Sequence, residues 1–289
     1  MFIDANQRVR RGYRWCREFS RSHYENFPVA SLLLPRHLRD PVAAIYTFAR
    51  IADDVADEGQ ATASGRLEVL DAMSIALRQT GTGQPPDEPM YYALADTIQR
   101  HQLPVDLFEN LLSAFRQDVT QSRYANFGEL MDYCRRSANP VGRLLLHLEK
   151  QTSERNIALS DAVCSALQLI NFLQDISRDY EKNSRIYLPL DEMERFKVDE
   201  NAIANQLNNP AARSLIQFQV ERASKLLRSG SPLGTTLPGR LGLEVRAIIL
   251  GGSRILEKLY YRVNPFSRPR LNRTDRMKIT WGALRKGFH

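Results

Sequence analysis

The sequence has few cysteines and lacks a long unbroken hydrophobic run. Its three cysteines, among 289 residues, are far apart and form no C-x-x-C pair, so neither a disulfide framework nor a zinc site is expected. No apolar run approaches the roughly eighteen residues that a membrane-spanning helix needs. The polar, arginine-rich N-terminus is unlike a signal peptide. We therefore expect a cytoplasmic protein, in contact with the inner membrane surface at most.

Strand-type alternation, fixed-period repeats and glycine-rich nucleotide-binding motifs are also missing. The apolar residues recur instead with helical spacing. This spacing predicts helices over residues 6–26, 38–58, 64–79, 90–101, 104–118, 127–137, 140–151, 158–182, 199–207, 210–229 and 240–262. The predicted fold class is all-α. We expect one domain over residues 1–289, with a core over about 20–270 and a basic C-terminal tail over 271–289.

Positive charge is in excess and unevenly distributed. The net charge is +7, and residues 262–286 contain eight Lys and Arg residues against one acid, Asp275. A basic balance suits nucleic acid, an anionic lipid surface or a phosphorylated substrate. The basic segment therefore has two readings, a solvated tail or a segment that attracts anionic lipid.

Residues 46–58 place three aspartates within otherwise apolar sequence. Residues three and four apart share a helix face, so Asp53 and Asp57 hold two carboxylates one turn apart, on the stripe that also carries Tyr46 and Arg50. Like charges at this spacing destabilise a bare helix. A divalent cation would offset that repulsion.

A second polar stripe occupies residues 168–179. Asn171, Asp175 and Asp179 follow one another in steps of four, and Gln168 lies three residues before them. Oxygen ligands of this kind suit a hard cation, Mg²⁺ or Mn²⁺. One Asp-x-x-x-Asp pattern is usually a solvated helix face, but two such patterns in apolar sequence favour binding of a cluster of two or three Mg²⁺ ions against a diphosphate.

The two stripes resemble the paired motifs of the squalene/phytoene synthase family, the head-to-head prenyl synthases. Residues 53–57 are similar to the first motif and residues 171–179 to the second, and the resemblance extends from His23 to about Arg270. It implies an isoprenoid-synthase-type helical bundle with a central cavity. By position it implies metal binding by Asp53, Asp57, Asn171, Asp175 and Asp179, and catalytic roles for Asp53, Asp57, Asp175, Asp179, Tyr46 and Arg50.

Three stretches, residues 23–30, 51–59 and 133–142, are most similar to the bacterial branch that forms hydroxysqualene for hopanoid biosynthesis. That branch ionises presqualene diphosphate with Mg²⁺, and water captures the rearranged cation. By position, the resemblance implies substrate contacts at His23, Tyr24, Glu25, Asn26, Phe27, Tyr46, Arg50, Tyr133, Val141, Gly142, Gln168, Asn171, Arg185 and Tyr187.

Two regions depart from the pattern of family members. Gln174 stands where many have Arg, which removes a cation from the phosphate region. Gly251 and Gly252 lie where some relatives have a diphosphate-binding tyrosine, so that a glycine there opens space and removes a donor.

Several alternatives stay open within and outside this family. The enzymatic ones are presqualene diphosphate synthase, squalene synthase and phytoene synthase, with farnesyl diphosphate as a substrate. NADPH is not expected for the preferred reading. Other enzymes of the squalene pathway and a membrane surface are the expected partners, and nucleic acid is not. The non-enzymatic alternative is a basic helical protein that binds nucleic acid or anionic membrane.

Overall fold

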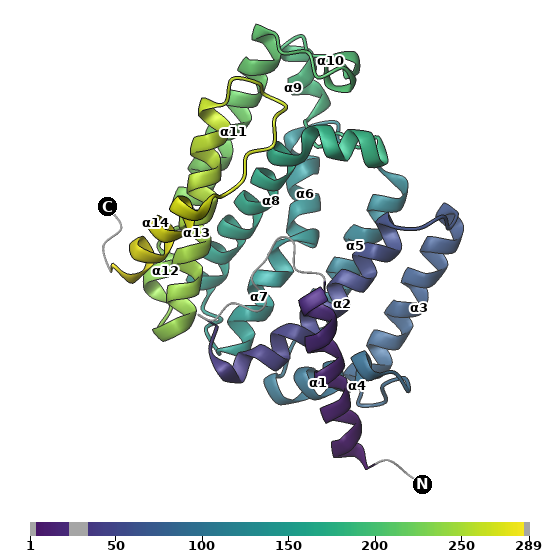
Figure 1. The fold of residues 1–289 in the computed structure, drawn as a ribbon. Coiled ribbons are helices and arrows are strands. Elements are labelled where there is room, and N and C mark those ends of the chain that lie inside the picture. The colour runs from purple at the N-terminus through teal and green to yellow at the C-terminus, as the bar shows by residue number, and fades with distance from the viewer. Residues whose placement is uncertain (1–3, 23–33, 286–289) are drawn as a thin grey trace. The chain divides into compact units, whose positions relative to one another are not determined.

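Helices make up the regular structure of this protein. The computed structural model describes residues 4–22 and 34–285, and within these ranges it contains fourteen α-helices, one 3₁₀ helix and no strand (Figure 1). This confirms the predicted all-α class. Internal contacts divide the chain into two compact units. Unit 1 comprises residues 1–120 and 140–152, and unit 2 comprises residues 121–139 and 153–289.

Unit 1 is built around one central helix. Its helices are α1 (Ala5–Ser22), η1 (Arg36–Leu38), α2 (Arg39–Asp57), α3 (Ala63–Gly81), α4 (Pro89–His101), α5 (Val105–Thr120) and most of α7 (Asn139–Leu148). Helix α2 packs against α1, α3, α4 and α5. Pro41 lies in the first turn of α2, where the missing amide hydrogen leaves no intrahelical bond unmade.

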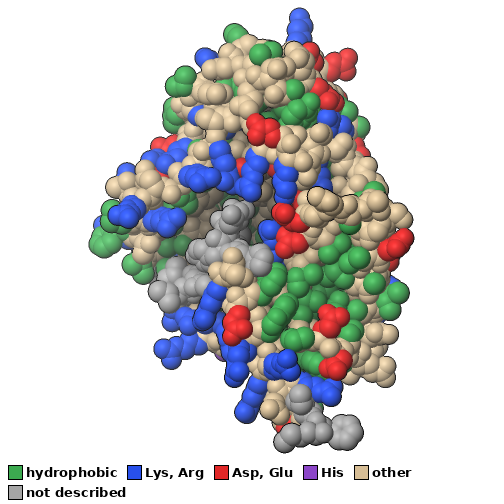
Figure 2. Space-filling view, turned by 45° about the vertical axis from the view of Figure 1, so that its right-hand side comes forward, with side chains coloured by type: hydrophobic (Ala, Val, Ile, Leu, Met, Phe, Trp, Pro, Cys, Tyr) green, Lys and Arg blue, Asp and Glu red, His purple; other side chains and the backbone are tan. Residues whose placement is uncertain are grey.

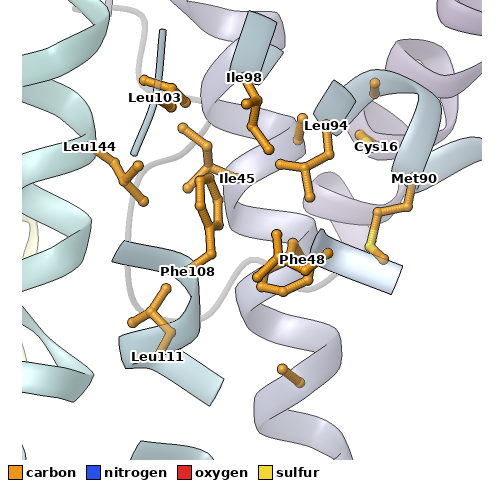
Figure 3. Close-up of a cluster of buried hydrophobic side chains, with 14 of the residues drawn as sticks. Cys16, Ile45, Phe48, Met90, Leu94, Ile98, Leu103, Phe108, Leu111 and Leu144 are labelled. Atoms are coloured by element: carbon orange, nitrogen blue, oxygen red, sulfur yellow. The ribbon is translucent and has the colours of Figure 1, made fainter. Parts of the chain in front are cut away.

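The core of unit 1 is apolar and tightly packed (Figure 3). Phe48 of α2 is fully buried and meets Phe108 of α5 edge-on, with ring centroids 5.6 Å apart. Gly12 allows the close approach of α1 to α4, because a β-carbon there would lie 2.4 Å from the Pro89 carbonyl oxygen. The first acidic stripe therefore lies on the helix around which this core is packed.

Unit 2 also has a central helix, α8. Its helices are α6 (Phe127–Ser137), α8 (Glu154–Asn183), α9 (Leu190–Arg195), α10 (Glu200–Ala204), α11 (Pro210–Gly230), α12 (Leu233–Thr236), α13 (Gly239–Tyr261) and α14 (Arg273–Leu284). Helix α8 packs against α6, α10, α11, α12 and α13. The second acidic stripe thus also lies on the helix that holds its unit together.

The predicted helices all occur, most with ends within a few residues of the prediction. The sequence did not predict the short helices η1, α9 and α12, nor α14, which lies within the basic segment 271–289. One helix of the described residues, α8, is long and apolar enough to span a membrane by length and average hydropathy, although no unbroken apolar run was found in the sequence. Its packing within unit 2 is that of a core helix.

Lys and Arg side chains are frequent on the molecular face in Figure 2, in keeping with the net charge of +7. Acidic side chains are fewer there, and several lie beside basic ones.

Candidate active site

The first acidic stripe lies at the C-terminal end of α2, opposite the buried face of that helix. Phe48, Ala52 and Ala56 point into the core of unit 1, and this leaves Asp53 and Asp57 partly exposed. The structure thus places the predicted carboxylates on one partly solvated helix face. Tyr46, also predicted for this site, is half-buried on the same helix.

Arg50 lies among the carboxylates of its own helix. One guanidinium nitrogen is 2.6 Å from Asp54 Oδ1, and another is 3.6 Å from Asp53 Oδ2. Burial by itself would lower the pKa of Arg50, but the carboxylates of Asp53 and Asp54 outweigh it and raise that pKa. The stripe therefore stabilises positive charge at this end of α2.

Arg66 of α3 holds the last turn of α2 in place. Its guanidinium donates hydrogen bonds to the carbonyl oxygens of Val55 at 3.0 Å, Ala56 at 2.6 Å and Gly59 at 2.9 Å. These carbonyl groups lie at a helix end, where intrahelical donors are missing. Arg66 therefore fixes the backbone on both sides of Asp57, and no sequence pattern marked it.

The second stripe lies on α8, which is kinked at its middle acidic residue. Asp175 has φ −108° and ψ 15°, which depart from helical values. The long helix predicted over 158–182 therefore occurs within α8, but the kink at Asp175 was not predicted. Gln168 and Asn171 precede the kink and Asp179 follows it, and all three are half-buried.

The carboxylate of Asp175 is nearly enclosed and binds an arginine from far along the chain. Its side chain is 7% exposed, and Arg268 Nη2 donates to Asp175 Oδ2 at 3.0 Å, while Arg268 Nε contacts the other oxygen. This two-pronged contact matches the fork of a guanidinium to a carboxylate. In the sequence, Arg268 was only one member of a basic segment.

The segment after α13 lies along α8 and positions Arg268. Gln174 Nε2 donates to the Pro269 carbonyl oxygen at 2.9 Å, and Ser177 Oγ donates to that of Phe266 at 3.3 Å. Arg262 donates to the Leu173 carbonyl oxygen at 3.3 Å, and burial lowers the pKa of Arg262 to about 10. This segment thus brings the cation of Arg268 to Asp175, next to Gln174.

The glycines near position 251 differ in how much space they leave. A β-carbon at Gly252 would lie 2.9 Å from Leu167 Cδ2 and 3.2 Å from Leu227 Cδ2. Among the described residues, a β-carbon at Gly251 would have one neighbour within 4 Å, Leu271 Cδ1 at 3.8 Å. The expectation of open space is therefore wrong for Gly252, whose missing side chain allows α13 to pack on α8. The expectation holds for Gly251.

A pocket in unit 2 adjoins the second stripe. Its walls are mainly apolar and come from α6, α8, α11 and residues 185–188; they are formed by Leu130, Leu169, Phe172, Leu173, Ile176, Asp179, Arg185, Ile186, Tyr187, Leu188 and Gln219. Two charged groups, Asp179 and Arg185, therefore share one recess with hydrocarbon side chains. Such a lining suits a ligand with an anionic head and an apolar body.

Aromatic rings cluster beside this pocket. Tyr187 stacks on Phe172 with ring centroids 3.8 Å apart and planes 7° apart. Tyr133 lies 6.1 Å from Phe172 and 5.9 Å from Tyr187, and the fully buried Tyr124 completes the cluster. The fold thus brings the predicted Tyr133 and Tyr187 together with Phe172, while Tyr124 was not predicted.

Two further predicted site residues lie on α7. Val141 packs against the core of unit 1, and Gly142 is buried on the same helix, α7. Five of the predicted substrate contacts lie outside the described residues: His23, Tyr24, Glu25, Asn26 and Phe27.

The two stripes fit a hard cation in their donor chemistry. Among residues 4–22 and 34–285, no group of three or more His, Cys, Asp or Glu side chains is gathered so as to hold a metal ion. Mg²⁺ typically takes one or two protein carboxylates and completes its shell with water and phosphate oxygens. Both stripes are rich in oxygen ligands, and each already stabilises a guanidinium cation.

Comparison with known proteins gives one consistent family. The family model for squalene/phytoene synthase matches residues 20–279. The hydroxysqualene synthase of Rhodopseudomonas palustris is 38% identical over 264 residues, which cover 90% of this chain and 88% of the relative. That of Zymomonas mobilis is 40% identical over 228 residues, which cover 78% and 75%.

Solved structures agree with this result. The crystal structure of a squalene synthase from Alicyclobacillus acidocaldarius has a TM-score of 0.81 and 38% identity, and the match covers 87% of this chain and 94% of that one. A dehydrosqualene synthase matches with a TM-score of 0.83 at 20% identity, which supports the fold alone.

Proposed function

This chain belongs to the squalene/phytoene synthase family, and we propose that it is a hydroxysqualene synthase that acts on presqualene diphosphate. The observation that carries the proposal is the pocket of unit 2, in which Asp179 and Arg185 share a recess with apolar and aromatic side chains. The names of the relatives from Rhodopseudomonas palustris and Zymomonas mobilis support the same reaction.

The proposed reaction is an ionisation followed by capture of water. The carbon–oxygen bond to the diphosphate breaks, and the diphosphate leaves with the bonding electrons. The rearranged carbocation then forms a new carbon–oxygen bond with water, which loses one proton. The released diphosphate is the proposed acceptor of that proton.

The acidic stripe of each unit is proposed to hold Mg²⁺ together with diphosphate oxygens. The ligands are Asp53 and Asp57 in unit 1 and Asn171, Asp175 and Asp179 in unit 2. Bound Mg²⁺ would stabilise the negative charge that develops on the leaving diphosphate. Arg50 and Arg185 would add hydrogen bonds to its oxygens, because a guanidinium suits phosphate.

The aromatic rings of unit 2 are proposed to face the carbocation. An aromatic face attracts a cation by about 0.5–2 kcal/mol, and Tyr133, Phe172 and Tyr187 lie close to the charged residues of the pocket. Their apolar neighbours would exclude bulk water, so that the position of one water molecule would decide the product.

Incubation of the purified chain with Mg²⁺ tests the reaction. Presqualene diphosphate alone should give hydroxysqualene, with one oxygen from labelled water when the reaction runs in H₂¹⁸O. Farnesyl diphosphate should give no product, and NADPH should change nothing. Squalene formed only with NADPH, or a product from farnesyl diphosphate only, would overturn the proposal.

A second reaction has a specific observation in its favour. The relative of known structure from Alicyclobacillus acidocaldarius, 38% identical, is named a squalene synthase. The same assay separates the two reactions, because a complete squalene synthase must consume a reductant. We expect the enzyme to work in the cytoplasm, with other enzymes of the squalene pathway supplying its substrate and using its product.

A further inference from the structure

Helix α14 packs on α13 (Figure 1). The carboxylate of Asp275 is buried and accepts a hydrogen bond from Arg254 Nε at 2.6 Å, and Lys258 Nζ lies 2.5 Å from it. At the other end of the helix, Arg246 Nε donates to the Ala283 carbonyl oxygen at 2.8 Å. These bonds fix which side of α14 turns outward.

The outward side carries three large apolar side chains. Met277, Trp281 and Leu284 are 64%, 61% and 60% exposed. They are spaced by four and three residues, so they form one stripe along the helix. Single exposed apolar residues are common on protein surfaces, but a contiguous stripe marks an interaction surface.

Every exposed charge on this helix and at its end is positive. Arg273, Arg276, Lys278 and Arg285 are exposed, whereas Asp275 is enclosed in its ion pairs. The guanidinium of Arg285 lies over the Trp281 ring, 5.0 Å from its centroid. An apolar stripe with a tryptophan and a purely basic rim is complementary to the interface of an anionic membrane.

We propose that the α14 stripe, formed by Met277, Trp281 and Leu284 with its basic rim, docks on the surface of an anionic lipid bilayer. The long Lys and Arg side chains would reach the headgroups while the apolar side chains enter the interface. A second copy of this chain is the poorer occupant, because two such rims would repel each other. The proposal is strengthened by the proposed function, since prenyl substrates and products are lipids.

The intact surface can be tested through its own tryptophan. The chain has two tryptophans, Trp15 and Trp281, so Trp15→Phe leaves Trp281 as the sole reporter. With vesicles of equal phosphatidylglycerol and phosphatidylcholine, we expect co-sedimentation and a blue shift of the emission. Pure phosphatidylcholine should give neither, and high salt should weaken both. A blue shift that depends on protein concentration without vesicles would indicate self-association and overturn the proposal.

Two pairs of variants distinguish binding through the α14 stripe from nonspecific hydrophobic binding and from binding through the net positive charge of the protein. Met277→Asp with Leu284→Asp should lower vesicle binding about tenfold, while Val69→Asp with Ile75→Asp, on exposed positions of α3, should leave it unchanged. Neutralising Arg276, Lys278 and Arg285 to Gln should weaken binding more than neutralising the exposed Arg10, Arg11 and Arg14 of α1. Equal losses within either pair would overturn the proposal.

Vesicle binding can be measured without turnover, so the docking surface and the proposed reaction can each be contradicted independently of the other. Binding without conversion of presqualene diphosphate would count against the reaction only. Conversion of substrate presented in detergent, without binding to anionic vesicles, would count against the docking surface only. Circular dichroism confirms that each variant is folded before it is compared.

Discussion

The two central helices, α2 and α8, both carry carboxylates that pair with an arginine, but the two arginines come from different parts of the chain. On α2, Arg50 is three and four residues from the carboxylates that it pairs with, and all three side chains are partly exposed. On α8, Asp175 is 7% exposed, and its arginine, Arg268, lies 93 residues further along the chain.

The difference shows that the burial of a carboxylate determines which cationic partner it requires. A partly exposed carboxylate is screened by water, so a neighbour on its own helix suffices. An enclosed carboxylate requires a well-aligned cation with further hydrogen bonds, because its desolvation is costly. Unit 2 therefore uses the segment after α13 to bring a guanidinium to Asp175.

The largest expected effect comes from removing one acidic charge from either stripe. Asp53→Asn and Asp175→Asn should each lower kcat about a hundredfold or more, the usual loss when one group that stabilises transition-state charge is removed. The matched control is Asp71→Asn, which removes an exposed carboxylate that pairs with Arg116 on the surface of unit 1. Single-turnover rates measure the effect, and loss of activity in the control alone would contradict it.

The second prediction contrasts an aromatic ring of the unit 1 core with one of the unit 2 pocket. Phe48→Ala should lower the free energy of unfolding by about 3–5 kcal/mol, because it leaves a cavity, with little change in the products of the folded enzyme. Tyr187→Leu keeps bulk but removes the ring, and should lower kcat about fivefold to tenfold through the lost cation–π attraction. Urea unfolding measures the loss of stability, turnover rates measure kcat, and product analysis shows whether the products change. A large change in the products of Phe48→Ala would contradict the purely structural role predicted for that ring.

The third prediction compares the stability that each arginine–carboxylate pair contributes. Arg268→Gln should lower the free energy of unfolding by about 3 kcal/mol, because it leaves the enclosed Asp175 without its cation. Arg50→Gln should cost about 0.5 kcal/mol, because its partners are partly solvated. Urea unfolding without Mg²⁺ measures both. Similar losses for the two variants would show that burial does not separate the pairs.

The last predictions concern the pH dependence of stability, whose direction differs between the two units. Burial raises the pKa of Tyr13 in unit 1 well above its ordinary value, so its contribution to stability is complete below pH 10 and is lost above it. The loss is at most about 1.4 kcal/mol per pH unit. Tyr13→Phe should flatten the alkaline slope of the unfolding free energy.

In unit 2, the pKa of Asp275 lies well below its ordinary range, mainly because Lys258 donates a hydrogen bond to it. Its contribution is complete above the unfolded pKa of about 4 and is lost as the pH falls below that value. Asp275→Asn should therefore remove part of the acid slope and leave the alkaline slope unchanged. Urea unfolding between pH 2 and pH 11 separates the two cases.

Much of the fold could be predicted because it depends on local patterns. Helical periodicity located the long helices, and the step of four residues placed each acidic stripe on one helix. Short elements such as α9 and α12 have too few residues for a periodic pattern to emerge. The kink at Asp175 left no mark in the spacing, because the residues on both sides continue the helical pattern.

The parts of the site that were missed are all contacts between distant segments. Arg66 reaches the end of α2 from the next helix, Arg268 reaches Asp175 from beyond α13, and Tyr124 meets Tyr187 through the fold of unit 2. None of them belongs to a spaced pattern with the residues that it contacts. An isolated arginine or tyrosine in a sequence has no signal that separates it from a surface residue.

By itself, the sequence determined the helical class, the family and the two oxygen-rich stripes, because each depends on residue types at short spacing. Only the tertiary structure decided which cation neutralises Asp175, which rings surround the pocket and which side of α14 turns outward. The physical reason is that burial and long-range pairing depend on which segments pack together. That choice is made by the whole core and not by any single stretch of the chain.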